Sequence, residues 1–320
     1  MLDLSKCPLY KLSSKRGLKY ILHINDNKWF RQKYVSGFIT PYVDKAKNRL
    51  IEAPDEQLKL IQKRIKNCLN TIIVPDNVFS GIKKRSYIDN VRLHANNSSC
   101  NMFKLDFSAF FPSISRDRVY SFFRNDLECS PDISAILTNF TTIDLNLSKR
   151  KTAEIDAFLQ QKGITERCHL LSGSPASQIL SYLVNHKMFD EMQTIADHNH
   201  LTMTVYVDDV FFSGKCRISK SIRKSILRIV EKNHFHISKN KVGQFHKGDF
   251  KKVTGVVIDS KGQMIPCNTI RKNIIEEFRK LKADPTNEAS RLRLRGLLIA
   301  ARQVNGSIFQ NIYKYAFKKF

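Results

Sequence analysis

The hydrophobic pattern is most distinctive in residues 202–213, where two β-prone arms flank adjacent carboxylates. Val, Thr, Tyr and Phe favour strands, and a pair of Asp residues suits the turn between them. The pattern therefore predicts a hairpin with Asp208 and Asp209 at its tip. Adjacent carboxylates repel each other unless positive charge lies beside them, and a divalent metal ion is the natural occupant. The alternative is a solvated turn, in which each Asp bonds to its own backbone.

A third carboxylate follows an apolar run far upstream of this hairpin. Residues 102–105 predict a strand that ends at Asp106, and an aromatic pair with Pro112 then leads toward a helix from about Ser115 to Phe123. A lone Asp at the end of a strand is commonly a cap or a surface residue. Taken together, the two acidic stretches favour one functional site over two unrelated turns.

The rest of the chain alternates helical periodicity with short strands. A helix over residues 55–69 has a stripe of Leu and Ile, and residues 252–258 predict one strand. The polar, Lys-rich residues 141–168 predict a surface insertion with a solvated helix. Further helices are expected in residues 5–24, 154–162, 179–188 and 218–230, and over most of 268–320 with a turn near 284–287.

Charge narrows the class of partner. Fifty-four Lys and Arg against 29 Asp and Glu give a net charge of +25, spread over many segments. Such a field favours a polyanion, with nucleic acid as the default and a membrane surface as the competitor. The sequence has no apolar run of transmembrane length and no signal-peptide core after Met1, which predicts a soluble, cytoplasmic protein. Its seven scattered cysteines argue against a zinc module and a disulfide framework.

The order Asp106, an aromatic Phe111 five residues later, and Tyr206-Val207-Asp208-Asp209 resembles the palm of reverse transcriptases. Val253-Thr254-Gly255 resembles the primer-grip strand of the bacterial retron enzymes in particular. The resemblance implies an α+β right-hand polymerase. Its fingers would occupy residues 1–100, its palm 101–265 with 141–178 as an insertion and return of the fingers, and its helical thumb 266–320.

The same resemblance implies the metal chemistry. Two Mg²⁺ ions would be held by Asp106 and Asp208, with Asp209 assisting and the Phe107 carbonyl contributing. One ion would lower the pKa of the attacking hydroxyl and the other would neutralise the triphosphate. Lys241 matches the family's motif lysine and would protonate the departing pyrophosphate, the alternative being a surface lysine in a basic chain.

The nucleotide site is expected around two further segments. Lys47 and Arg49 alternate before a proline, which predicts that they share one face of a strand. The resemblance implies that this is the fingers strand, whose basic side chains contact the incoming triphosphate. The alternative is an exposed strand edge protected by the two cations. Phe111 matches the aromatic placed against the sugar's 2′ position. Ser172 and Gly173 lie in a Gly/Pro turn that would approach the sugar-phosphate, and Ser172 stands where the family usually has Gln.

RNA contacts are expected from residues that combine positive charge, aromatic rings and side-chain amides. Two of them match a retron Asn-Ala-x-x-His element, in which Val91 here replaces the Ala, and the others lie in the predicted thumb. The RNA-binding candidates are Asn90, His94, Arg291, Arg293, Tyr313 and Tyr315.

For function, the resemblance implies DNA synthesis from deoxynucleoside triphosphates on a dedicated structured noncoding RNA. It also implies priming from an internal ribose 2′-hydroxyl, branched RNA–DNA (msDNA) as product, and anti-phage defence with an effector protein. Three alternatives remain: another bacterial defence reverse transcriptase, a template-independent polymerase of the abortive-infection type, and a non-catalytic RNA-binding module. Three intact carboxylates argue against the last.

Overall fold

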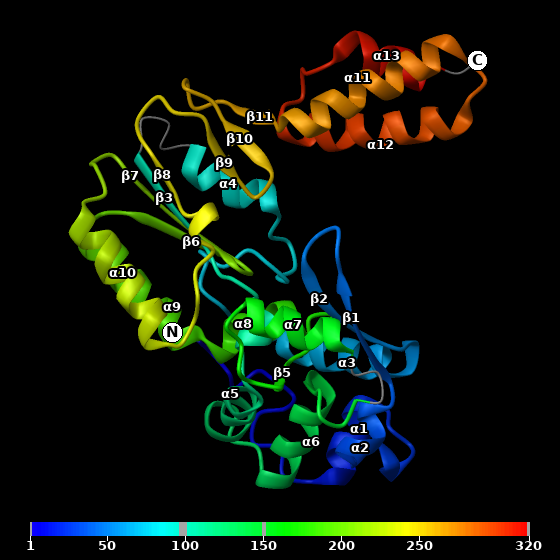
Figure 1. Cartoon of the computed structure of the whole chain (residues 1–320), viewed down its shortest axis with the longest axis vertical. Helices are drawn as coiled ribbons and strands as arrows, with labels where there is room; N and C mark the ends of the chain where they lie inside the picture. The colour runs from blue at the N-terminus through cyan, green and yellow to red at the C-terminus, as the bar shows by residue number, and fades with distance from the viewer. Residues whose placement is uncertain (1, 96–100, 149–151, 319–320) are drawn as a thin grey trace.

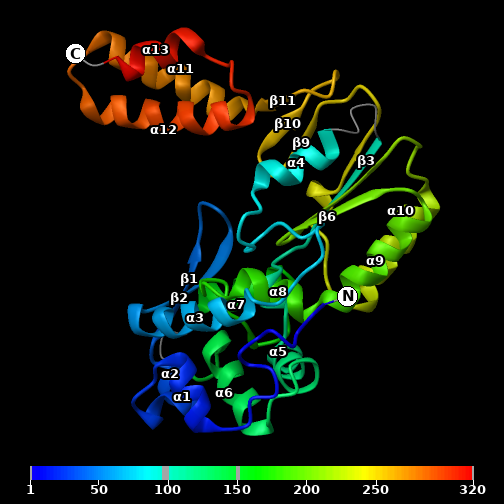
Figure 2. The ribbon, with the colours of Figure 1, turned by 180° about the vertical axis from the view of Figure 1, so that it is seen from behind.

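The computed structural model describes residues 2–95, 101–148 and 152–318, and it has the α+β composition expected from the sequence. A body of helices and short antiparallel sheets carries a separate helical lobe at one end, and the two chain termini lie far apart (Figure 1). The view from behind shows the same division (Figure 2). No helix of the described residues is long and apolar enough to cross a bilayer.

The central sheet has four antiparallel strands in the order β6-β7-β3-β8. They are β6 (Thr202–Tyr206), β7 (Asp209–Gly214), β3 (Asn101–Asp106) and β8 (Gly243–Phe245). Alternation along a strand sends neighbouring side chains to opposite faces, so Phe211 and Phe212 lie in different core clusters. Helix α4 (Tyr87–Ala95) packs on the Phe211 face, whereas α9 (His186–His198) and α10 (Lys220–Lys232) contribute to the larger core on the other face.

The N-terminal part builds a long two-stranded hairpin on a helical base. Strands β1 (Ile39–Asp44) and β2 (Arg49–Pro54) pair in antiparallel register, and α3 (Glu56–Leu69) follows. Asp55 caps α3 by accepting a hydrogen bond from the Leu58 amide. The short opening helix predicted within residues 5–24 is observed as α1, which begins at Lys15 behind its cap Ser14. Before the hairpin lie α1 (Lys15–Leu22), η1 (Asn27–Phe30) and α2 (Gln32–Ser36).

Between β3 and β6 the chain forms a mainly helical layer with one small sheet. Its elements are η2 (Phe111–Ser113), α5 (Arg116–Ser121), η3 (Phe122–Asp126), α6 (Pro131–Thr141), β4 (Thr142–Asp144), α7 (Ala153–Gln161), β5 (Cys168–Leu170) and α8 (Ser177–Val184). The helix predicted at 154–162 is observed as α7, but it is solvated on one face only, because Ile155, Phe158 and Leu159 are buried. Lys149, Arg150 and Lys151 of the predicted insertion lie outside the described residues.

The C-terminal part begins with a second small sheet and ends in the helical lobe. The single strand expected over 252–258 is instead a hairpin of β9 (Lys251–Val253) and β10 (Val256–Ile258). Positive φ angles at Thr254 (41°) and Gly255 (89°) turn the chain back between them. Strand β11 (Met264–Pro266) completes this sheet. The lobe consists of α11 (Asn268–Ala283), α12 (Glu288–Val304) and α13 (Gln310–Phe317), which share their own apolar cluster.

Candidate active site

The three predicted carboxylates lie together where β3, β6 and β7 end. The β6–β7 hairpin forms as predicted, with Val207 and Asp208 as its two turn residues, and Asp106 is the register partner of Asp209. Val207 has a φ of 56°, a strained value for a β-branched residue. The Phe107 amide donates to the Asp208 carbonyl oxygen at 2.9 Å, which ties the turn to the end of β3. Sheet register therefore joins the two acidic stretches into one site.

Burial and mutual repulsion raise the pKa values of the carboxylates at the hairpin, and two lysines contact the site. Burial, then the neighbouring Asp209 and Asp106, raises the pKa of Asp208 to about 6. Burial also raises the pKa of Asp209, although Lys104 opposes the change. Lys104 Nζ lies 2.8 Å from Asp209 Oδ1, and Lys241 Nζ lies 3.0 and 3.1 Å from the Asp106 carboxylate oxygens.

This donor set fits a hard divalent cation. Carboxylate oxygens are the ligands that such a cation prefers, and its charge would relieve the repulsion that raises the pKa of Asp208. Within the described parts of the chain, no three His, Cys, Asp or Glu side chains are already gathered as a ready-made cluster. Asp209 contacts Lys104, and Asp106 contacts Lys241. Asp106, Asp208 and Asp209 are the residues that would hold a metal ion.

A cavity of about 780 Å³ opens beside Asp208. It is lined from the β1–β2 hairpin, the segment after β3, α7, the turn before α8 and the segment before β8. The predicted site residues that line it are Lys47, Arg49, Phe107, Phe111, Ser172, Asp208 and Lys241. A basic, partly aromatic cavity next to a carboxylate is suited to a nucleoside triphosphate and its metal.

The two cations of the β1–β2 hairpin reach this cavity, but not in the predicted way. Arg49 is the first residue of β2, whereas Lys47 lies in the turn rather than on the strand. The Lys47 amide donates to Asp44 Oδ1, and its ammonium lies 3.9 Å from Asp44 Oδ2. The expectation that both cations share one face of a strand is wrong, because the hairpin turns between Asp44 and Arg49.

Lys241 is positioned by the segment that follows α10. The Ser238 amide donates to the Asp106 carbonyl oxygen at 3.0 Å and starts the short helix η4 (Lys239–Lys241). This backbone contact places Lys241 so that its ammonium lies beside the Asp106 carboxylate and lines the cavity. The expected role of Lys241 as proton donor to the pyrophosphate stays a prediction.

Ser172 and Gly173 are engaged with β2 to different degrees. Ser172 lines the cavity, but its hydroxyl donates to the Leu50 carbonyl oxygen and accepts from the Glu52 amide. Gly173 does not line the cavity, and a Cβ there would overlap the Glu52 carbonyl oxygen. The expected role of Gly173 in nucleotide binding is therefore corrected: its missing side chain lets β2 approach the turn.

His94 is a structural residue, which corrects its assignment to RNA binding. It is buried, and its ring nitrogens lie 2.7 Å from Ser213 Oγ and 2.8 Å from Thr204 Oγ1. Asn90 is also buried, but its side-chain amide has no hydrogen-bond partner among the described residues, and its RNA-binding role stays a prediction. Burial lowers the pKa of His94 to about 3, so this imidazole is neutral and links α4 to β6 and β7. The signal in the sequence was the two hydroxyl residues inside otherwise apolar strands, because buried hydroxyls need partners.

The two tyrosines of the helical lobe that were expected to bind RNA contact other side chains of the lobe. Tyr313 stacks on Phe317 at 4.4 Å between ring centroids, and the Arg302 guanidinium lies 4.3 Å from the Tyr313 centroid. Tyr315 packs edge-on against Phe278. Both tyrosines are only partly exposed, and their RNA-binding role stays a prediction.

The two arginines predicted to bind RNA lie on α12. Arg293 is exposed, and Arg291 donates to the Pro285 carbonyl oxygen at 2.8 Å. Both arginines contribute positive charge to the helical lobe, and their RNA-binding role stays a prediction.

Several residues of the site escaped the sequence analysis. Lys104 lies two residues before Asp106 on β3, a spacing that places both side chains on one face and could have revealed it. Phe158 and Lys162 line the cavity from α7 and its end, at an i, i+4 spacing typical of one helix face. Glu52 and His169 are buried behind the cavity and carry no local signal.

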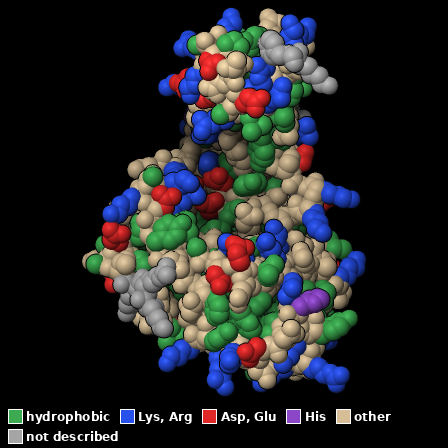
Figure 3. Space-filling view, turned by 90° about the vertical axis from the view of Figure 1, so that its right-hand side faces the viewer, with side chains coloured by type: hydrophobic (Ala, Val, Ile, Leu, Met, Phe, Trp, Pro, Cys, Tyr) green, Lys and Arg blue, Asp and Glu red, His purple; other side chains and the backbone are tan. Residues whose placement is uncertain are grey.

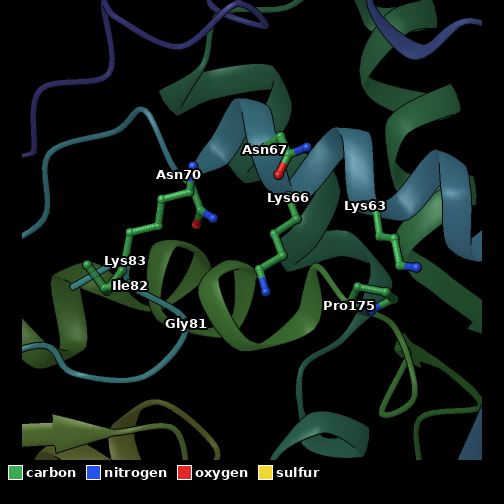
Figure 4. A pocket seen from close by; sticks show the side chains of 8 residues that line it. All are labelled: Lys63, Lys66, Asn67, Asn70, Gly81, Ile82, Lys83 and Pro175. Carbon is green, nitrogen blue, oxygen red and sulfur yellow. The ribbon is translucent and has the colours of Figure 1, made fainter. Parts of the chain in front are cut away.

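A second hollow of about 530 Å³ lies on the far side of the turn before α8. Lys63 and Lys66 of α3 and Lys83 of the following loop surround it, with the amides of Asn67 and Asn70 above and Pro175 below (Figure 4). Three ammonium groups and two amides around one hollow suit a phosphate group.

Comparison with known proteins places these observations in a family. A model described as "Reverse transcriptase (RNA-dependent DNA polymerase)" matches residues 40–271. The chain is 22% identical to the retron Ec83 reverse transcriptase of Escherichia coli over 273 residues, covering 83% of this chain and 82% of that protein. It is 36% identical to the retron Se72 reverse transcriptase of Salmonella heidelberg (strain 579083-10) over 99 residues, 31% of this chain and 26% of that protein.

Two further similarities are more distant. The retron Mx65 reverse transcriptase of Myxococcus xanthus is 26% identical over 266 residues, 80% of this chain and 58% of that protein. Among solved structures, apo telomerase from Candida tropicalis aligns with a TM-score of 0.44 at 10% identity, over 68% of this chain and 52% of that one. The chain thus spans between about a quarter and four-fifths of these retron proteins.

Proposed function

We propose that this chain, which belongs to the reverse transcriptase family, is the RNA-directed DNA polymerase of a bacterial retron. The observation that carries the proposal is the meeting of Asp106, Asp208 and Asp209 beside a basic cavity of nucleotide size. The right-hand polymerase architecture of the family agrees with the central antiparallel sheet and the helical lobe. In this proposal residues 1–100 are the fingers, 101–265 the palm and 266–320 the thumb.

Each part of the cavity has a task in nucleotidyl transfer. Two Mg²⁺ ions, when bound, lower the pKa of the attacking hydroxyl and neutralise the triphosphate. Asp106, Asp208 and Asp209 hold them, with help from the Phe107 carbonyl. Lys47 and Arg49 meet the phosphates from the hairpin, and deoxynucleoside triphosphates are the substrates. Lys241 orients Asp106 and delivers a proton to the departing pyrophosphate.

The template in this proposal is a structured noncoding RNA, as the retron relatives suggest. Lys and Arg side chains are scattered over both the helical lobe and the body on the face shown in Figure 3, in keeping with the net charge of +25. The lysine-lined hollow of Figure 4 adds a phosphate site near the turn before α8. Priming from an internal 2′-hydroxyl would yield branched RNA–DNA in the bacterial cytoplasm. The retron would act in anti-phage defence together with an effector protein.

A template-independent polymerase is the second candidate function. Ser172 stands where the family usually has Gln, and its hydroxyl bonds to the β2 backbone. The two candidates are separated by incubating the protein with a synthetic RNA template, a DNA primer and single deoxynucleotides. A reverse transcriptase incorporates only the nucleotide that the template specifies, whereas a template-independent enzyme incorporates without regard to it.

Phe111→Ala is expected to admit ribonucleotides. Phe111 lines the cavity and packs beside Phe110, with 6.0 Å between ring centroids. Removing the ring opens space for a 2′-hydroxyl, so discrimination against ribonucleotides should fall by about tenfold or more. The measurement is kcat/KM for GTP against dGTP. Phe250→Ala, at an exposed position outside the cavity, is the control. An unchanged ratio in Phe111→Ala would remove this residue from sugar selection.

Neutralising Arg293 and Arg291 of the lobe is expected to weaken the binding of all RNAs to the same degree. Each lost phosphate contact should lower the slope of log affinity against log salt by about one. The measurement is RNA affinity over a salt series for Arg291→Gln and Arg293→Gln. Lys11→Gln makes the same charge change far along the chain, where Lys11 pairs with Glu128, and serves as control. Equal slopes in the wild type and the lobe variants would place the RNA elsewhere.

A further inference from the structure

A buried acid–base pair lies behind the nucleotide cavity and joins two distant segments. Glu52 of β2 and His169 of β5 both have an exposed fraction of 0%, and 117 positions separate them in the sequence. His169 Nε2 lies 2.6 Å from Glu52 Oε1. A buried carboxylate is stable only with close hydrogen-bond partners, so this contact holds the two strands at a fixed separation.

The pair belongs to a larger set of bonds between β2 and residues 169–173. Glu52 Oε2 accepts a hydrogen bond from the Ser172 amide at 2.8 Å, and the Glu52 amide donates to Ser172 Oγ at 3.0 Å. The Ser172 hydroxyl donates in turn to the Leu50 carbonyl oxygen at 3.0 Å. Gly173 lets the two backbones come this close. Both oxygens of the Glu52 carboxylate are therefore used to tie the turn to the strand.

The hydrogen-bond pattern also indicates which partner carries the charge. His169 Nδ1 is buried and has no hydrogen-bond partner. A proton on Nδ1 would be a buried donor without an acceptor, which costs more than a bare nitrogen acceptor. The favoured tautomer is a neutral imidazole that donates from Nε2, so Glu52 stays anionic between two donors.

Neither residue of the pair lines the cavity, but Glu52 directly follows the lining residue Ile51, and His169 lies three positions before the lining residue Ser172. Arg49, Leu50 and Ile51 form one wall from β2, and Ser172 forms part of another. The carboxylate joins these two walls from behind. A change in its bonds would therefore alter the distance between the phosphate-binding arginine and the Ser172 turn without removing either.

We propose that Glu52 and His169 are positioning residues that fix the width of the nucleotide cavity. This inference rests on the proposed polymerase function, because its readout is the binding of a deoxynucleotide. Loosening the pair should raise KM for the nucleotide much more than it lowers kcat, and it should leave RNA affinity unchanged.

The experiment compares His169→Gln with His169→Met. The side chains have similar volumes, but only Gln carries an N–H donor near the position of Nε2. We expect KM for dGTP to stay within about threefold of wild type in His169→Gln and to rise about tenfold or more in His169→Met, which loses a hydrogen bond to a charged group.

Melting temperature and RNA affinity are measured in parallel. If His169→Met does not fold, Glu52→Gln, which keeps the side-chain shape, takes its place with the same expected rise in KM.

Glu154→Gln is the matched control for the hairpin. It removes an exposed ion pair of 2.8 Å to Lys45, in the turn of the same hairpin, and should leave KM unchanged. Equal KM values for the folded Gln and Met variants of His169 would overturn the positioning role. Wild-type protein that makes no DNA would instead overturn the polymerase function. In that case equilibrium binding of fluorescent dGTP to the same variants still tests the pair.

Discussion

Asp208→Asn is expected to abolish DNA synthesis while RNA binding persists. The substitution keeps the shape of the side chain but removes the negative charge of a proposed metal ligand at the tip of the β6–β7 hairpin. DNA synthesis should fall by at least about a thousandfold, as when a group that stabilises transition-state charge is lost. RNA affinity should remain, because it comes from lysines and arginines distributed over the whole chain. The measurements are incorporation of labelled dNTP and equilibrium RNA binding.

Asp106→Asn should give the same result, because Asp106 is the register partner of Asp209 at the end of the adjacent strand. Asp197→Asn, an exposed residue near the end of α9, makes the same chemical change away from the cavity and should leave synthesis intact. DNA synthesis by Asp208→Asn or Asp106→Asn at a rate near wild type would remove these residues from the metal site.

Lys241→Met is expected to have the second largest effect, a fall in kcat of about a hundredfold. Its ammonium lies 3.0 and 3.1 Å from the Asp106 oxygens and lines the cavity, where it can both orient the carboxylate and release a proton. Lys241→Arg separates the two roles, because Arg keeps the positive charge but does not release its proton at working pH. Recovery by Arg would assign Lys241 to positioning alone.

Lys247→Met, at an exposed position in the loop after β8, is the control for loss of a lysine and should leave kcat unchanged. A kcat for Lys241→Met near that of the wild type would contradict a role for Lys241 in the reaction.

The site could be predicted where local pattern and strand geometry agree. The alternation of β-prone residues around Asp208 and Asp209 was enough to predict the hairpin, and the apolar run before Asp106 predicted β3. The resemblance to reverse transcriptases then grouped these acids with Lys241 and Phe111. The structure brings all of them to one cavity or its edge.

The remaining differences come from long-range packing. His94 matched an element expected to bind RNA, but its partners Thr204 and Ser213 lie more than a hundred positions away in the sequence. Tyr313 has the Arg302 guanidinium of α12 over its ring, a contact that no local pattern indicates. A sequence window shows side-chain chemistry but not which other segment covers a side chain, so the burial of His94 could not be predicted from its neighbours in the sequence.

Turn chemistry accounts for another group of differences. Lys47 and Arg49 alternate as they would on a strand, yet the chain reverses between Asp44 and Arg49. Thr254 takes a positive φ that its residue type disfavours, so one predicted strand is two. In both places the pairing partner, rather than local preference, decides where the strand ends.

The function proposed for this chain is RNA-templated DNA synthesis on a dedicated noncoding RNA. It is tested most directly by incubating the purified protein with dNTPs, Mg²⁺ and the folded RNA encoded beside its gene, and by sequencing any DNA formed. We expect DNA that is complementary to part of that RNA and still attached to it, so that ribonuclease treatment shortens the product, with little synthesis on an unrelated hairpin. DNA of a sequence unrelated to the RNA, or equal synthesis without any RNA, would contradict it.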